Sequence, residues 1–122
     1  MSRAIHSSPS KVQSLLTTYP QLVSEISTGG ATPLHVCGMS LEGQRSTQIL
    51  VDEGADINVI DSYGYNALHR MCSNNLALGA EVLVTAGLDP HGRKGNEESP
   101  VDVAKSSRAV DVLHMFQRLG YL

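Results

Sequence analysis

The stretch Thr32-Pro33-Leu34-His35 decides the fold, because it returns in altered form twice along the chain. The second copy is Asn66-Ala67-Leu68-His69, and the third is Ser99-Pro100-Val101-Asp102. Each copy opens with a side chain that accepts hydrogen bonds from the free N–H groups at a helix N-terminus. Proline follows in two copies, at the first helical position, where no N–H partner is lost. The three copies therefore predict three helix starts.

A glycine follows each helix start at a nearly constant distance. Gly54, Gly87 and Gly120 are spaced 33 residues apart, while the three starts are separated by 34 and then 33 residues. One extra residue therefore lies inside the first interval, and we place it in the loop near Gly43. Glycine is favoured just after a helix because the chain there often takes a left-handed conformation. A period of about 33 residues indicates a stacked array of helical repeats.

The first full repeat carries a family resemblance. The run Gly30-Ala31-Thr32-Pro33-Leu34-His35, followed by I-L-V-D-E-G-A-D-I-N from Ile49 to Asn58, closely resembles an ankyrin repeat. The second repeat keeps the glycine at Gly64 and the histidine at His69, whereas the third has Glu97 and Asp102 in those places. The resemblance implies an all-α solenoid, in which each repeat has two antiparallel helices and a projecting β-turn finger, and the repeats stack into a curved slab.

The resemblance covers nearly the whole chain. We expect a single ankyrin domain of about four repeats, with boundaries near 1–26 (partial), 27–60, 61–93 and 94–122. In the partial repeat only Ala4 and Ile5 remain of the first helix, so it is either a truncated terminal cap or the edge of a longer array. We predict that Ser10 caps its second helix. Leu50 and Leu83 occupy equivalent apolar positions and are predicted to lie inside the stack.

Composition excludes several classes of function. Nine basic and twelve acidic residues give a net charge of −3, without the clustered basic face that nucleic-acid binding requires. No apolar run approaches the ~20 residues of a membrane span. Cys37 and Cys72 are predicted to be small buried residues and not a disulfide, which favours a reducing compartment. We therefore expect a monomer in the cytoplasm or nucleus that binds neither nucleic acid nor membrane.

Catalytic and metal sites are not predicted. His35 with Cys37, and His69 with Cys72, are possible zinc ligands by residue type. Zinc needs its ligands at ~2.0–2.3 Å from one ion, whereas equivalent positions on stacked helices lie ~8–10 Å apart. Gly29-Gly30 lacks the lysine and hydroxyl of a phosphate-binding loop. We predict no metal, no cofactor and no enzymatic activity. The family resemblance implies instead that the two histidines bond to backbone groups within and between repeats.

Tyr63 and Tyr65 are the strongest candidates for partner contact. Residues two apart on an extended finger point to the same side, and tyrosine is enriched at binding hot spots. The alternative is that one ring covers a neighbouring repeat. Arg70 is unusual because its counterparts, Val36 and Val103, are apolar. A charge in that place must be paired or must reach water along its own stem.

The resemblance implies a non-catalytic module that binds a partner protein through its finger tips and through the concave face of its first helices. The alternative is a regulatory or targeting segment of a larger enzyme or scaffold protein, in which the same surface binds intramolecularly. The candidate contact residues occupy the finger tips and first-helix faces: Met39, Asp61, Ser62, Tyr63, Tyr65, Ser73, Asn74, Arg93, Lys94, Asn96, Glu98 and Lys105.

Asn58 is a candidate modification site. With Leu50, Asp56 and Ile57 in matching places, it resembles the ankyrin asparagine that a cytosolic asparaginyl hydroxylase modifies in some family members. The simpler expectation is structural, because the short amide of asparagine satisfies backbone groups in tight turns. We therefore predict that Asn58 mainly holds a turn, and that hydroxylation is secondary.

Overall fold

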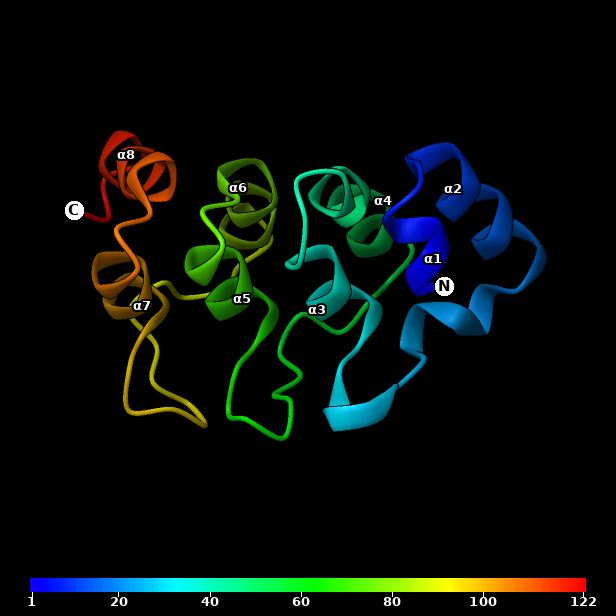
Figure 1. The fold of residues 1–122 in the computed structure, drawn as a ribbon, viewed down its shortest axis with the longest axis horizontal. Helices are drawn as coiled ribbons and strands as arrows, with labels where there is room; N and C mark the ends of the chain where they lie inside the picture. The colour runs from blue at the N-terminus through cyan, green and yellow to red at the C-terminus, as the bar shows by residue number, and fades with distance from the viewer.

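The computed structural model of the protein describes all 122 residues as helices and turns, without a β-strand. Four helix pairs stack along the long axis, with the first helices in one row and the second helices in another (Figure 1). The first helices are α1 (Ser2–Ile5), α3 (Pro33–Cys37), α5 (Ala67–Ser73) and α7 (Pro100–Ser106). The second helices are α2 (Pro9–Thr18), α4 (Thr47–Asp52), α6 (Ala77–Thr85) and α8 (Val110–Arg118). The predicted all-α stack of helix pairs is therefore confirmed.

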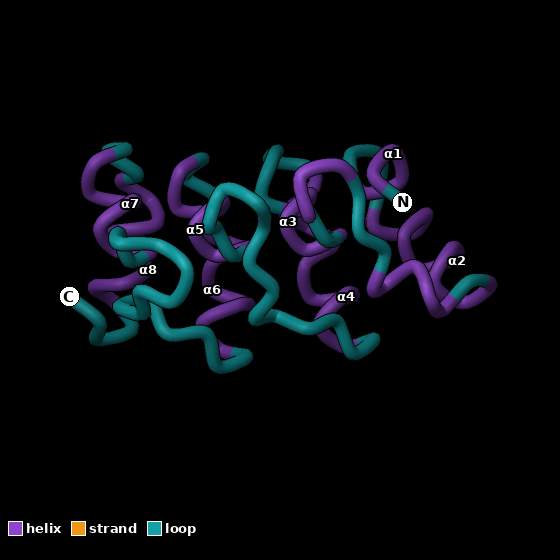
Figure 2. The backbone as a smooth tube through the Cα atoms, turned by 90° about the horizontal axis from the view of Figure 1, so that it is seen from below, coloured by secondary structure: helices purple, strands orange, loops and turns teal.

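The loops between repeats form three fingers, the first at residues 27–31, the second at 59–65 and the third at 89–98. They project from the row of first helices on the side away from the second helices (Figure 1). Figure 2 views the stack from this side, with the finger loops lying across the helices. Short 3-10 turns interrupt the N-terminal half of the chain: η1 (Pro20–Ser24), η2 (Thr28–Gly30) and η3 (Gly43–Ser46). The last of these lies between α3 and α4, where the extra residue of the first repeat was expected.

The three predicted helix starts are confirmed. Thr32, Asn66 and Ser99 each accept a hydrogen bond from the backbone N–H three residues later, and the side chain at that later position bonds back to the cap residue's own N–H. This reciprocal capping box satisfies two otherwise free donors at each start. It depends only on residues three apart in sequence, which is why the pattern could be recognised from the sequence.

The partial repeat corrects one prediction. Ser8, and not Ser10, caps α2, because its Oγ accepts from the N–H of Lys11 at 3.3 Å. Proline is tolerated at the first helical position and not deeper, so the cap must be the residue immediately before Pro9. Ala4 and Ile5 are buried, as expected for the remainder of a first helix.

The second helices of the later repeats begin in a different way. Neither α6 nor α8 has a capping side chain at its own N-cap position. The preceding repeat supplies the acceptor in both cases: Gln44 Oε1 accepts from the N–H of Gly79 at 3.0 Å. Asn75 Oδ1 accepts from the N–H groups of Asp111 at 3.0 Å and Val112 at 3.2 Å. These helix starts therefore depend on contacts across the repeat interface.

One continuous apolar core runs through the stack. Leu50 and Leu83 are both 0% exposed, which confirms their predicted interior positions. Cys37 and Cys72 are also buried and unpaired, as predicted. Burial raises the pKa of the Cys37 thiol to about 12, and it raises that of Cys72 as well, so neither ionises near neutral pH. Both cysteines therefore act as small core residues.

Candidate partner-binding surface

The second finger is organised around the Asp61 carboxylate. Its Oδ1 accepts from the backbone N–H groups of Tyr63 at 2.9 Å and Tyr65 at 3.0 Å. The Asp61 N–H in turn donates to the Tyr65 carbonyl at 2.9 Å, which closes the turn. The Asp61 side chain is only 2% exposed. The Asp61 carboxylate is therefore fully engaged inside the finger, where it supports the finger and is not presented at the surface.

Arg70 is the charged partner of Asp61. Its Nη2 and Nε donate to Asp61 Oδ2 at 2.8 and 3.2 Å. Burial alone would raise the pKa of Asp61, but Arg70 and the N–H groups of Tyr65 and Tyr63 outweigh burial and hold that pKa below its usual value. The charge at an apolar repeat position is thus satisfied by a carboxylate nine residues earlier. Sequence reasoning had not connected these two residues.

Both tyrosines of the second finger contact the same guanidinium group. The Arg70 Cζ lies 4.5 Å from the ring centroid of Tyr65 and 5.6 Å from that of Tyr63. Both rings therefore contact one charged group, in a geometry that favours cation–π attraction. Tyr65 is half-buried and its ring also lies 5.5 Å from that of His69, so it covers its own repeat. Tyr63 is 73% exposed and presents a ring to solvent.

Neighbouring fingers are held together by backbone contacts. The N–H and the hydroxyl of Ser62 both donate to the Gly29 carbonyl at 2.8 Å. On the other side, a Cβ added to Gly64 would lie 2.3 Å from the Gly95 carbonyl oxygen, so only glycine fits at this approach. The three finger tips therefore form one continuous surface. Ser62 belongs to that surface, but its hydroxyl is already engaged in holding it together.

His35 and His69 connect each repeat to the next finger. Nδ1 of each accepts from the backbone N–H of its own helix cap at 3.1 Å. Nε2 donates at 2.8 Å to the carbonyl of Tyr65 in one case and of Glu98 in the other. Burial lowers the pKa of both imidazoles and outweighs these carbonyl bonds, which would raise it. Both histidines are therefore neutral, and they make the bonds that the family resemblance implies.

The candidate contact residues on and after the first helices differ in whether their side chains are already hydrogen-bonded within the protein. Met39 is 46% exposed, and Ser73 and Lys105 are also exposed. Asn74 is exposed as well, but its Nδ2 donates to the Gly38 carbonyl at 2.7 Å and ties α5 to the end of α3. The first three side chains are free for partner contact, whereas Asn74 contributes to the packing of the repeats.

The third finger is more open than the second. Arg93, Lys94 and Glu98 are exposed, and Asn96 is half-buried with its Oδ1 accepting from the Glu98 N–H at 2.9 Å. Arg93 pairs with Asp102 at 3.1 Å, but the two side chains are 65% and 39% exposed. This finger presents both signs of charge to solvent.

The turn at Asn58 corrects another prediction. Asn58 is exposed and its backbone N–H donates to the Asp56 carboxylate at 2.9 Å, while its own amide side chain makes no hydrogen bond. Asp56 therefore holds the turn, through the bond to a residue two positions later that aspartate commonly makes. Asp89 and the N–H of His91 repeat this arrangement one finger later, at 2.9 Å.

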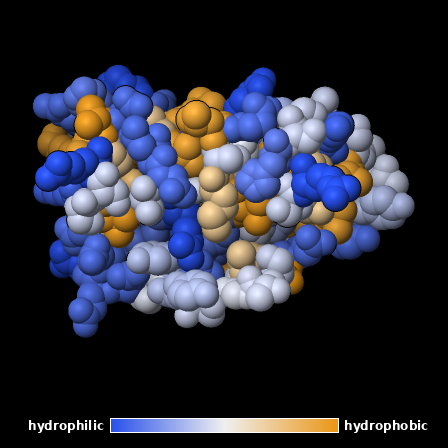
Figure 3. Space-filling view, in the orientation of Figure 1, coloured by the Kyte–Doolittle hydropathy of each residue, from blue (hydrophilic) through white to orange (hydrophobic).

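No three His, Cys, Asp or Glu side chains are gathered as metal ligands. None of the helices is both long enough and apolar enough to cross a membrane. The largest groove, of about 450 Å³, lies between α1 and α2 and not at the fingers. On the face of the molecule seen in Figure 3, apolar side chains occur in separate spots among hydrophilic ones.

Comparison with known families agrees with this geometry. A family model described as "Ankyrin repeat" matches residues 29–62, and one described as "Ankyrin repeats (many copies)" matches residues 50–104. Together they cover more than half of the chain. A search of curated proteins finds no match. Ankyrin repeats are generally protein–protein interaction modules and are typically non-catalytic. The chain belongs to the ankyrin repeat family.

Proposed function

We propose that this protein binds a partner protein through its finger tips and the exposed ends of its first helices. The observation that carries the proposal is Tyr63, a ring 73% exposed on a finger whose backbone is fixed by Asp61. The guanidinium of Arg70 lies against the same ring and is itself fixed by Asp61. A preorganised aromatic side chain loses little conformational freedom on binding, which favours affinity.

The surroundings of Tyr63 suit a protein partner. Protein interfaces combine aromatic residues, methionine and arginine with a polar rim. The exposed candidates that remain available around the fingers and first helices have this character: Met39, Ser73, Arg93, Lys94, Glu98 and Lys105. On the face seen in Figure 3, apolar side chains lie in separate spots among hydrophilic ones, which supports a polar interface with isolated apolar anchors.

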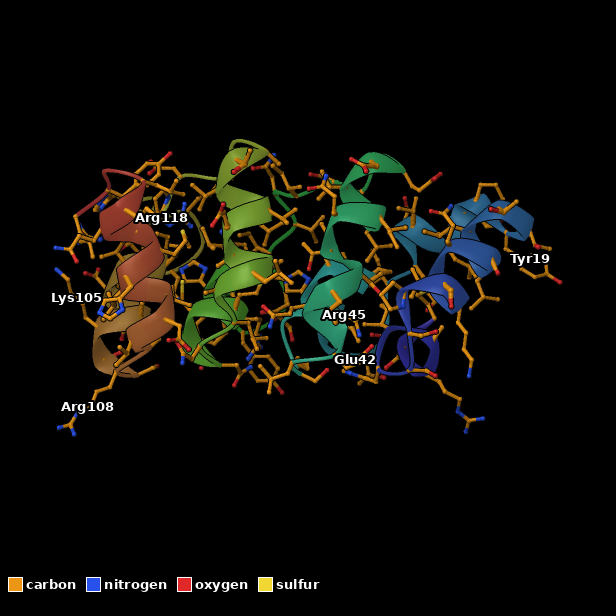
Figure 4. All side chains as sticks on the ribbon, turned by 90° about the horizontal axis from the view of Figure 1, so that it is seen from above. Tyr19, Glu42, Arg45, Lys105, Arg108 and Arg118 are labelled. Atoms are coloured by element: carbon orange, nitrogen blue, oxygen red, sulfur yellow. The ribbon has the colours of Figure 1, made fainter.

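The test compares two exposed tyrosines. Tyr63→Ala removes the proposed anchor, and Tyr19→Ala removes a ring that is 50% exposed at the opposite end of the stack from Lys105 (Figure 4). Proteins captured by the wild type are identified, and their dissociation constants for the three forms are then measured. We expect Tyr63→Ala to weaken binding about thirtyfold or more, as at a hot spot, and Tyr19→Ala to leave it unchanged. Equal effects of the two substitutions contradict the proposal.

A modification of the same surface is also proposed. The side-chain amide of Asn58 is exposed and free of hydrogen bonds, which supports its selection by an asparaginyl hydroxylase. The test is incubation with such an enzyme followed by peptide mass spectrometry. Addition of one oxygen atom to Asn58, and none to the other asparagines, is the expected result. An unmodified Asn58, even in partly unfolded protein, rules the modification out.

A further inference from the structure

Three helices of this chain open with a hydroxyl residue followed by proline. The pairs are Ser8-Pro9, Thr32-Pro33 and Ser99-Pro100, and each hydroxyl caps its helix. Thr32 and Ser99 are only 7% and 2% exposed. Ser8 is half-buried in the turn between α1 and α2, and its neighbours Ser7, Ser10 and Lys11 are exposed. The same local motif therefore lies inside the stack in two cases and at the surface in one.

The cap at Ser8 is also the only one of the three that lacks a reciprocal side-chain bond. Its Oγ accepts from the Lys11 N–H at 3.3 Å, and its carbonyl accepts from the Val12 N–H at 3.3 Å. No side chain bonds back to the Ser8 N–H, whereas Thr32 and Ser99 are both held in closed capping boxes. The Ser8 hydroxyl also lies 3.2 Å from the Ser10 hydroxyl, so freeing it breaks this bond and the long bond from Lys11, both at the surface. Hydroxyl access at Ser8 needs a small local opening, and access at the other two needs disruption of the core.

The residues after Ser8 add a recognition pattern. Proline has no N–H, so an enzyme pocket that buries the residue after Ser8 leaves no donor without a partner. Lys11, three positions after Ser8, offers an exposed ammonium group to an acidic surface. Protein kinases choose substrates by charge patterns of this kind. We propose that Ser8 is a phosphorylation site for a proline-directed serine/threonine kinase that also recognises a basic residue three positions after the phosphoacceptor.

The reaction is an ordinary phosphoryl transfer from ATP. The Ser8 Oγ bonds to the γ-phosphorus as the bond from that phosphorus to the β,γ-bridging oxygen breaks, so ADP leaves. The hydroxyl proton passes to the catalytic aspartate of the kinase. The product carries a charge of about −1.5 to −2 at the N-terminus of a helix of 10 residues. A negative charge is favourable there because it complements the helix dipole.

The modified side chain would also change its surroundings. Ser7, Ser10 and Lys11 line the groove of about 450 Å³ between α1 and α2, together with Arg3 and without any acidic residue. A phosphate on Ser8 places negative charge at the edge of this basic groove. On Thr32 or Ser99, by contrast, the same dianion would have to be buried, which is strongly unfavourable. The structure therefore tolerates the modification at one of its three hydroxyl–proline pairs.

The experiment uses the full folded chain, a purified kinase of this specificity, ATP and Mg²⁺, with phosphopeptide mass spectrometry as the readout. We expect phosphate on Ser8 and none on Thr32 or Ser99. Lys11→Ala should lower kcat/KM roughly tenfold, as for loss of a charged hydrogen bond, while Arg108→Ala, which removes an exposed basic side chain far from Ser8, leaves it unchanged. Pro9→Ala, which keeps the Ser8 hydroxyl, should abolish the reaction. Phosphorylation should raise Tm by about 1–4 °C.

Several results would overturn the proposal. One is an unmodified Ser8 under conditions in which the kinase fully phosphorylates its standard peptide. Another is equal modification of Ser99, which would mean that the kinase acts on unfolded chains and not on an accessible turn. Unchanged rates for Lys11→Ala or Pro9→Ala would remove the recognition pattern. Circular dichroism of each variant establishes that it is folded, so a loss of phosphorylation is not a loss of structure.

Discussion

The second and third fingers are each linked to the following first helix by an acid–arginine pair with partners nine residues apart, but in opposite order. Asp61 pairs with Arg70, and Arg93 pairs with Asp102. The first pair is 2% and 22% exposed, and the second is 65% and 39% exposed. Exposed pairs contribute little because water solvates both charges, whereas a buried carboxylate cannot be removed without stranding its partners. The second finger is therefore a fixed element, and the third is free to adapt to a partner.

The largest expected effect is that of removing the buried carboxylate. Asp61→Ala should lower the free energy of unfolding by about 3–5 kcal/mol, because it leaves a partly buried guanidinium and two N–H groups unpaired. Asp61→Asn keeps an oxygen acceptor and should lose less. Asp102→Ala should lose much less than either. Urea denaturation followed by circular dichroism measures all three, and similar losses for Asp61→Ala and Asp102→Ala would break the comparison between the fingers.

The pH dependence separates the two repeats that carry a buried histidine from the third, which carries Asp102 in that place. Because the pKa values of His35 and His69 lie below 6.5 in the folded state, the unfolded chain binds more protons just below pH 6.5. Stability should therefore be complete above pH 6.5 and fall as the pH drops below it. A second loss should follow below pH 3.8, when Asp61 is protonated. Thermal unfolding at pH 7 and pH 5 tests the first step, which should vanish when both histidines are replaced by glutamine.

Asp102 occupies the place of those histidines in the third repeat. It accepts from the Ser99 N–H at 3.1 Å, as the histidines do from their own caps. An ionised carboxylate has no proton to donate to a following finger. The third repeat should therefore contribute nothing to the loss of stability between pH 7 and pH 5. Amide hydrogen exchange at the two pH values, resolved by repeat, measures this difference.

A smaller effect of opposite sign is expected at Ser46. Its hydroxyl is buried without a hydrogen-bond partner, unlike the fully bonded carboxylate of Asp61. Removing an unsatisfied buried polar atom recovers its desolvation penalty, so Ser46→Ala should raise the free energy of unfolding by about 1 kcal/mol. The same urea titration measures the gain. A clear loss of stability would show that the hydroxyl has a partner in solution.

The smallest effect on stability is expected for Arg93→Ala. Its side chain is 65% exposed and pairs with another exposed residue, so the change in unfolding should lie within the error of a urea titration. If the third finger contacts the partner, the same substitution should weaken binding. A matched measurement on Arg70→Ala should show a large loss of stability, because it leaves the buried Asp61 carboxylate without its charged partner. Similar stability losses for the two arginines would contradict the distinction drawn here.

The sequence predicts those parts of this fold that depend on nearby residues. The helix starts at Pro33, Ala67 and Pro100 could be predicted because a capping box involves residues only three apart in sequence. The buried role of Asp61 could not, because a polar residue at a finger tip looks exposed until the position of Arg70 is known. The available signal was the charge at an apolar repeat position. Such a charge should prompt a search for an acid in the adjoining finger.

Two other errors arose among near neighbours in the chain. Ser8 and Ser10 are equally good caps by residue type, and only the restriction on Pro9 distinguishes them. Asp56 and Asn58 both favour turns, and the carboxylate that reaches a backbone N–H two positions later takes the structural role. In such cases residue preferences predict which segment forms the cap or the turn. Only the hydrogen bonds show which residue of that segment makes it.

The helix starts supplied by a preceding repeat give the solenoid a direction. Gln44 completes α6, and Asn75 completes α8, but no side chain of a later repeat caps an earlier second helix in return. Deleting an upstream unit would leave the next one with bare amide donors, whereas deleting a downstream unit leaves every earlier helix start intact. Units of this chain are therefore not interchangeable modules. If the repeats of this chain were reordered or duplicated, each second helix would still need a glutamine or asparagine in the repeat before it to accept from its first N–H groups.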